Sequence, residues 1–185
     1  MRNFRNIFAV FAAFFVFSTV NASAQNFTDS GRRVTALEQQ VLKEITKLPR
    51  YGVFDHIAFE VLPGNRVVLY GKVISLGTRK SAERVVSRVP GVQSVENRIT
   101  DLPPSPFDDR IRRGIVQNFV NSAGLYPYLR EPRPSVRIVV ENGRVTLEGY
   151  VNNRSTSNLM YMLANQVFGV FEVRNNLVID NGRDR

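Results

Sequence analysis

An internal repeat constrains the fold of this 185-residue chain more than any other feature of its sequence. Residues 64–100 align without a gap on residues 142–178. Eleven aligned positions are identical, whereas ordinary residue frequencies would give about two or three. The identical residues of the first copy are Arg66, Val67, Leu69, Gly71, Val73, Thr78, Val89, Gly91, Val92, Val95 and Asn97. A repeat of this length predicts two similarly folded domains in tandem.

Each copy has the pattern helix, strand, strand, helix, strand. In the first copy the opening helix has an apolar stripe, and Thr35 and Glu38 have the spacing of a capping box. In the second copy Asn142 and Gly143 predict a two-residue hairpin turn between the first two strands. The second helix has an equivalent apolar stripe in both copies. These stripes are Ala82, Val85, Val86 and Val89 in the first copy and Met160, Leu163, Ala164 and Val167 in the second.

Four glycines recur at equivalent positions, and we interpret them as structural. Gly71 and Gly149 lie on the inward face of a strand, which suggests that a helix backbone approaches the sheet closely there. Gly91 and Gly169 come two residues after the last apolar position of the second helix, where a left-handed C-cap is expected. The chain contains neither GxxxxGK[ST] nor GxGxxG, the two glycine patterns of phosphate-binding loops.

Two pairs of segments repeat one pattern: VLPGNRVVLYGKV with GVQSVENRI, and VVENGRVTLEGYV with GVFEVRNNL. This pattern resembles the BON domain of bacterial envelope proteins. The resemblance covers residues 30–101 and 107–180, with residues 102–106 as a proline-rich linker. It implies an α+β fold of two tandem αββαβ sandwiches, each with two helices packed on a small mixed sheet. It also implies a periplasmic, non-catalytic protein that binds phospholipid and supports envelope integrity under stress.

Residues 1–24 are predicted to be a signal peptide. Arg2 and Arg5 form a positive segment, residues 7–20 are apolar, and residues 22–24 have the small-x-small pattern of a cleavage site. We expect cleavage after Ala24 and export to the periplasm. The apolar run is shorter than the roughly 18–20 residues that span a bilayer, so an integral membrane protein is not expected. An uncleaved N-terminal anchor is the alternative.

Composition argues against catalysis. The chain has no cysteine and a single histidine, which excludes thiol nucleophiles and cysteine-based zinc sites. We interpret His56 as a loop or strand-edge residue, and Asp108 and Asp109 as the N-cap and dipole partner of a helix. No cofactor or metal is therefore expected. The formal net charge of +9 would suit nucleic acid, but export favours lipid headgroups as the anionic partner.

Two sets of residues are candidate contacts for lipid or a partner. The first is the basic side of a helix in the first copy, which carries Arg79, Lys80, Arg84 and Arg88. Guanidinium groups bind phosphate bidentately, although a solvated helix face is the simpler alternative. The second set comes from comparing the two copies. Large apolar or aromatic residues in the second copy replace four residues of the first: Ser81, Glu83, Arg84 and Pro90. The set consists of Leu159, Tyr161, Met162 and Phe168, with Phe171 at its edge.

A helix that is apolar nearly all round should be covered on two faces. The second cover would be the first copy, a partner chain or the bilayer. The connectors that contain Tyr51, Phe54 and residues 126–134 are either contact loops or lids over the core. Two functions therefore remain. The first is a membrane-surface module that binds anionic phospholipid, and the alternative is a periplasmic protein-interaction or holdase-like scaffold module.

Overall fold

The structure, a computed structural model, describes residues 35–122, 124–130 and 133–180. The predicted signal peptide, residues 1–24, lies outside this part of the chain. Among the described residues, no helix combines the length and the apolar character that crossing a bilayer requires.

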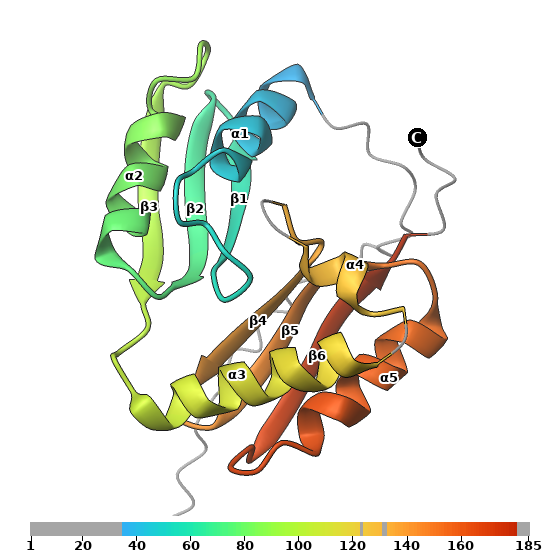
Figure 1. The fold of residues 1–185 in the computed structure, drawn as a ribbon. Coiled ribbons are helices and arrows are strands. Elements are labelled where there is room, and N and C mark those ends of the chain that lie inside the picture. Colours follow the sequence, from blue (N-terminus) through green and yellow to red (C-terminus); the bar gives the residue numbers. More distant parts are fainter. Residues whose placement is uncertain (1–34, 123, 131–132, 181–185) are drawn as a thin grey trace, which may run out of the picture. The chain divides into compact units, whose positions relative to one another are not determined.

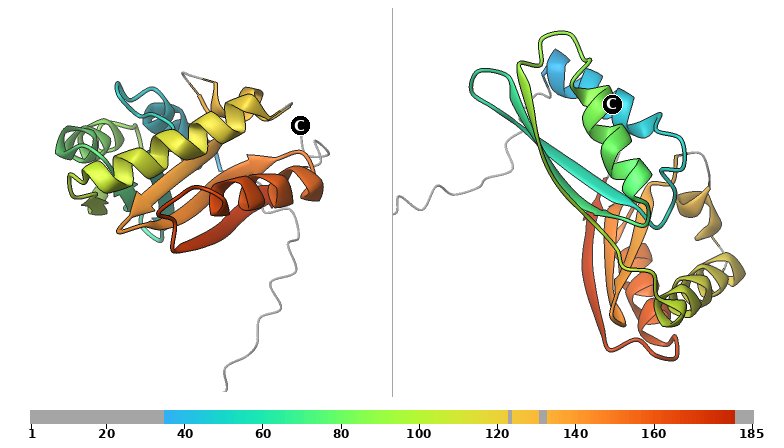
Figure 2. Two further views of the ribbon diagram at one scale, coloured as in Figure 1. Left: turned by 60° about the horizontal axis from the view of Figure 1, so that its bottom comes forward. Right: turned by 90° about the vertical axis from the view of Figure 1, so that its left-hand side faces the viewer.

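Repeat one (residues 35–101) contains two helices and a three-stranded sheet. In chain order its elements are α1 (Ala36–Thr46), β1 (His56–Leu62), β2 (Arg66–Val73), α2 (Leu76–Val86) and β3 (Ser94–Asp101). Strands β1 and β2 are antiparallel, and β3 pairs with β2 in parallel after the α2 crossover. Both helices cover the same face of the sheet (Figure 1 and Figure 2).

Repeat two (residues 105–180) has the same order of elements with one short helix added. Its elements are α3 (Pro106–Asn121), α4 (Tyr126–Leu129), β4 (Val136–Glu141), β5 (Arg144–Val151), α5 (Arg154–Asn165) and β6 (Glu172–Ile179). The sheet order is β4-β5-β6, again with one antiparallel and one parallel pair, and α3 and α5 lie on one face of it (Figure 1). The predicted α+β fold of two tandem αββαβ units is confirmed.

Each repeat buries its own apolar core between helices and sheet. In repeat one the stripe of α2 is buried at Ala82 and Val86, and in repeat two the stripe of α5 is buried at Met160 and Ala164. The α3–β4 connector closes the second core, because Leu125 and Leu129 at the ends of α4 are 2% and 7% exposed. Burial of these side chains supplies the main driving force for folding.

The interpretation of Gly71 and Gly149 requires correction, because no helix backbone approaches them. Gly71 has φ +123° and Gly149 has φ +112°, which L side chains rarely adopt. A Cβ atom at either position would clash with a main-chain carbonyl of the neighbouring strand segment, that of His56 or Ser135. The glycines therefore permit a close approach within the sheet, at the start of the antiparallel hairpin.

The expected left-handed backbone is present at Gly91 and Gly169, both with φ +93°, but neither is a helix C-cap. Helices α2 and α5 end earlier, at Val86 and Asn165. The glycines instead occupy the third position of a β-turn that follows each helix, closed in repeat two by a bond from Val170 N to Val167 O of 3.2 Å. A positive φ at that position is the requirement of a type II turn.

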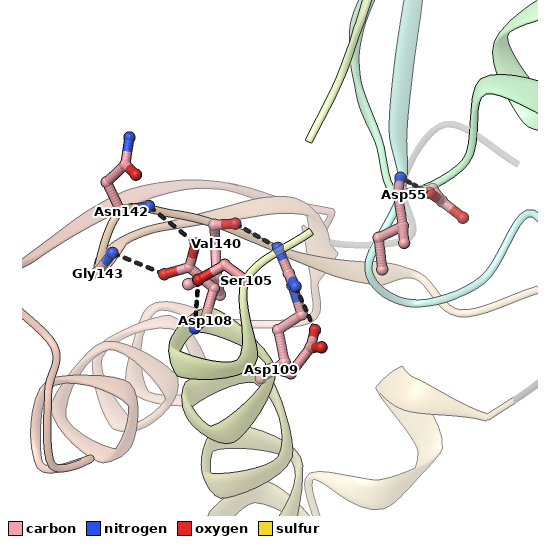
Figure 3. Close-up of polar contacts among 9 residues, drawn as sticks. Asp55, Ser105, Asp108, Asp109, Val140, Asn142 and Gly143 are labelled. Carbon is pink, nitrogen blue, oxygen red and sulfur yellow. Dashed lines mark hydrogen bonds and ion pairs between the residues drawn. The ribbon is translucent and has the colours of Figure 1, made fainter. Parts of the chain in front are cut away.

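The start of α3 is tied to the β4–β5 hairpin by a buried carboxylate (Figure 3). The N-cap is Ser105, whose side chain accepts from Asp108 N at 3.1 Å, so Asp108 is not the cap. The fully buried Asp108 carboxylate accepts from Asn142 N at 3.0 Å and from Gly143 N at 2.9 Å. Next to it, buried Arg112 pairs with Asp109 at 2.6 Å and donates to Val140 O.

Candidate functional site

The predicted contact residues of repeat two lie along α5 and on the turn that follows it. Asn153 caps the helix by accepting from Thr156 N at 2.8 Å, and the buried side chains of Met160 and Ala164 turn one face of the helix toward the core. With Met160 in the core, Tyr161 and Met162 point outward and are 41% and 50% exposed. One side of the helix therefore packs on the core, and another side exposes apolar residues to solvent.

Leu159 departs from the expectation for this surface. Its side chain is half-buried and packs against the core of its own repeat. It lies one position before Met160, a core residue, and packs at the edge of the core that contains Met160. The exposed part of the set is therefore Tyr161, Met162, Phe168 and Phe171.

Three phenylalanines form what we call the aromatic tip of repeat two: Phe107, Phe168 and Phe171. Phe168 is 96% exposed and Phe171 is 76% exposed, the two largest exposures among the large apolar side chains of the described residues. Phe171 is held by a bond from its N to Gly143 O of 2.9 Å, and its ring lies 6.4 Å from that of Phe107. Phe107 and Phe171 therefore contact each other, while Phe168 is exposed on the turn.

Unpaired guanidinium groups lie on both helices of repeat two, beside the aromatic tip on α3 and at the other end of α5 from the tip. Arg110 lies over the Phe107 ring at 6.0 Å, and Arg113 and Arg154 are exposed and form no ion pair within the described residues. Arg110 lies between Phe107 and Gly114 at helical spacing, and Gly114 meets the side chain of Val167 in the turn. The helical side of repeat two thus combines exposed apolar groups with positive charge.

Acidic residues near the tip are mostly neutralised by arginines. Asp109 pairs with buried Arg112, and Glu172 pairs with Arg174 at 2.9 Å and with Arg144 at 3.6 Å. The hydrogen bond from Arg174, and then its charge, lower the pKa of Glu172. The local surface therefore presents few uncompensated negative charges to an anionic partner.

The basic set of repeat one is only partly gathered on one face. Arg79 pairs with Asp101 at 3.3 Å and is half-buried, so it belongs to the domain's own ion pairs. Lys80 and Arg84 are exposed one helical turn apart on α2, and Arg88 lies just beyond the helix end. The exposed large apolar side chains of repeat one are Leu42 on α1, Ile74 before α2 and Leu76 at its start, and each is far less exposed than Phe168.

Sequence reasoning missed Phe107, Arg110 and Arg137. The first two lie at the start of α3, outside the gapless alignment, so the comparison of the two copies did not reach them. Arg137 is 8% exposed although it faces away from the core of its own repeat, and it contacts repeat one. The described residues hold no group of three or more His, Cys, Asp or Glu side chains that could bind a metal ion.

Comparison with known proteins decides the family. The BON domain model matches residues 33–101 and 108–181. The chain belongs to the BON-domain family. BON domains are associated with membrane- and envelope-related proteins. No curated protein matches the chain.

Two solved structures of CdsD, a structural protein of the type III secretion system of Chlamydia trachomatis, are similar to this BON protein. The C-terminal domain structure is 14% identical, covers 78% of this chain and 98% of its own, and has a TM-score of 0.31. The second structure is also 14% identical, covers 78% and 92%, and has a TM-score of 0.32. Likeness at this level carries no argument about function.

Proposed function

We propose that this BON-domain protein is exported to the periplasm, where it binds anionic phospholipid surfaces without catalysis and supports envelope integrity under stress. The observation that carries the proposal is the aromatic tip of repeat two, where Phe168 is 96% exposed. Exposure of an apolar phenyl ring to water is unfavourable, and transfer of that ring into the acyl boundary of a bilayer is favourable.

The surrounding charge favours an anionic surface over a neutral one. Arg110, Arg113 and Arg154 accompany the exposed apolar groups and have no acidic partner among the described residues. Basic residues near an anionic membrane contribute about 1 kcal/mol each. Exposed aromatic and basic groups on one helical side match the chemistry of interfacial binding.

Co-sedimentation with lipid vesicles tests the proposal. The protein purified from the cell envelope should sediment with vesicles that contain phosphatidylglycerol and remain soluble with phosphatidylcholine alone. Phe168→Ser should lower the affinity at least about tenfold, because one buried phenyl group is worth about 1.5–3 kcal/mol. Tyr126→Ser is the matched control, since Tyr126 is 55% exposed in the same repeat but lies on α4.

The dependence on salt separates this function from the alternative of a protein-interaction or holdase-like scaffold. Binding to anionic lipid through arginine should weaken as salt rises, because salt screens exposed charges. Absence of binding to anionic vesicles even at low salt would exclude the lipid function. The same result would leave the scaffold function in place.

A further inference from the structure

A loop of repeat one is bound to the edge strand of repeat two, at what we call the junction. Both repeats belong to one compact unit that spans Val34–Arg185. Ile138 N on β4 donates to Val53 O at 2.8 Å, which adds a main-chain hydrogen bond at the free side of that strand. Arg137 Nη1 donates to Gly52 O at 2.7 Å, and the guanidinium lies 4.1 Å from the centre of the Tyr51 ring.

The loop is held in shape by repeat one itself. Tyr51 is 7% exposed, and its hydroxyl accepts from Ile57 N at 3.1 Å. The Asp55 carboxylate accepts from Gly52 N at 3.0 Å and from Ile74 N at 2.8 Å. The loop therefore presents Gly52 O and Val53 O to repeat two with little conformational entropy left to lose on docking.

The only histidine of the chain lies at this junction. His56 begins β1 and is paired across the hairpin with Lys72 of β2, so both side chains share the outer face of the sheet. It borders a hollow of about 310 Å³ together with Arg137 and Tyr150 of repeat two. From α1 this hollow receives only the uncharged Leu42, Ile45 and Thr46.

The charges that face His56 come from both repeats. Lys72 and Arg137 are cations, and Glu148 of β5 is the facing carboxylate from repeat two. Lys72 forms an ion pair with Glu141 of β4, a further contact between the repeats. Glu148 already accepts from Asn176 Nδ2 at 2.8 Å. On its own loop the titratable neighbours of His56 are Tyr51 and Asp55.

We propose that the junction is an acid-sensitive contact, in which protonation of His56 adds a third positive charge beside Lys72 and Arg137 and releases the loop at residues 51–53 from β4. Neutral His56 adds no charge to the junction. The protonated imidazole places a positive charge in a half-buried position beside Arg137, where the facing carboxylate of Glu148 already accepts a hydrogen bond from Asn176. Acidification therefore favours the released arrangement, in which water solvates the imidazolium.

The protonation equilibrium of His56 supports this direction. Burial is the largest cause that lowers its pKa, Glu148 opposes the shift, and the charge of Arg137 lowers the pKa further. A histidine released from the junction would regain its ordinary pKa of about 6.5. Because the released state binds the proton more tightly, the proton in turn stabilises the released state.

A distance measurement between the repeats tests the proposal. The chain has no cysteine of its own, so spin labels can be attached at Gln40→Cys on α1 and Asn158→Cys on α5, both exposed. The labelled full chain is measured without vesicles at about pH 8 and at about pH 5.5, on either side of the ordinary histidine pKa. We expect one narrow distance distribution at the higher pH and loss of that narrow population at the lower pH.

Two variants assign the change to the junction. His56→Gln should keep the narrow distribution at both pH values, and Arg137→Met should lose it at both. A wild-type distribution that does not respond to pH overturns the proposal, as does a His56→Gln variant that responds like the wild type. A narrow distribution for Arg137→Met at both pH values also overturns it, because the loop would then be held by something else.

Discussion

The carboxylate of Asp108 accepts a hydrogen bond of 2.9 Å from Gly143 N and joins the first turn of α3 to the β4–β5 hairpin. The first helix of repeat one begins with a capping box, in which Glu38 accepts from Thr35 N at 2.7 Å. The two copies therefore share a fold but start their first helices with different polar contacts.

Replacing Asp108 should destabilise repeat two strongly. In Asp108→Ala the amides of Asn142 and Gly143 lose their acceptor inside the protein, which we expect to cost about 2–3 kcal/mol. Thermal unfolding followed by circular dichroism measures the loss. The control is Asn153→Ala, which removes the exposed N-cap acceptor of α5 in the same repeat and should cost about 1 kcal/mol. Equal losses in the two variants would contradict the assigned role of Asp108.

Gly149→Ala should destabilise the protein more than substitution of another left-handed glycine. The new Cβ would clash with Ser135 O in addition to its strained φ, so we expect a loss of at least about 3 kcal/mol. Gly124 also has positive φ, at +85°, but nothing lies within 4 Å of the position of its Cβ. Gly124→Ala should therefore cost only about 1–2 kcal/mol. Urea titration distinguishes the two outcomes.

The stability of the protein should fall on acidification through the range in which His56 titrates. Because its pKa is lowered in the folded state, the unfolded chain binds the proton first, near pH 6.5. The contribution is therefore present above about pH 6.5 and is lost as the pH falls through the folded-state pKa. Melting temperatures measured across this range should decrease in the wild type and change less in His56→Gln.

Protonation of Asp55 has the opposite effect on the stability of the protein. Burial is the main cause that raises its pKa, against hydrogen bonds from Ile74 and Gly52, so the folded state holds this proton more tightly than the unfolded chain. Its protonation therefore favours folding as the pH falls through the folded-state pKa. A steeper decline in Asp55→Asn than in the wild type at the acidic end would agree with this sign.

The basic groups of the two repeats should contribute unequally to binding of anionic vesicles. Replacing Arg110, Arg113 and Arg154 by Gln removes about 3 kcal/mol of surface attraction at low salt, an affinity loss of about 100-fold. The matched triple variant of repeat one replaces Lys80, Arg84 and Arg88. We expect a smaller loss there, because that side has no aromatic tip to bring it to the membrane. Equal losses would show that charge alone governs binding.

The elements of each repeat could be predicted because their signals are local. The capping box at Thr35, the Asn142-Gly143 turn and the apolar stripes of α2 and α5 all depend on neighbours close in sequence. The interpretation of Gly71 and Gly149 was wrong because alternation shows which face a residue takes, but not which backbone approaches it. That approach comes from the main chain at the start of β1 and β4.

The candidate site was predicted less completely. Phe168 emerged from the difference between the copies and Phe171 was placed at the edge of that set, whereas Leu159 of the same set is half-buried against its own core. Phe107 lies beside them because the start of α3 packs next to the turn after α5, a tertiary relationship that spacing does not encode. Arg137 gave no signal either, because its partners Tyr51 and Gly52 belong to the other repeat.

The turn after α5 keeps its shape through main-chain bonds and the backbone of Gly169, so the side chain at position 168 takes no part in holding the fold. The equivalent position in repeat one is occupied by Pro90, with the same backbone at Gly91. Folding thus leaves this position open to nearly any residue in either copy. A duplicated BON domain can therefore acquire or lose a contact by one substitution, while its sister copy preserves the scaffold unchanged.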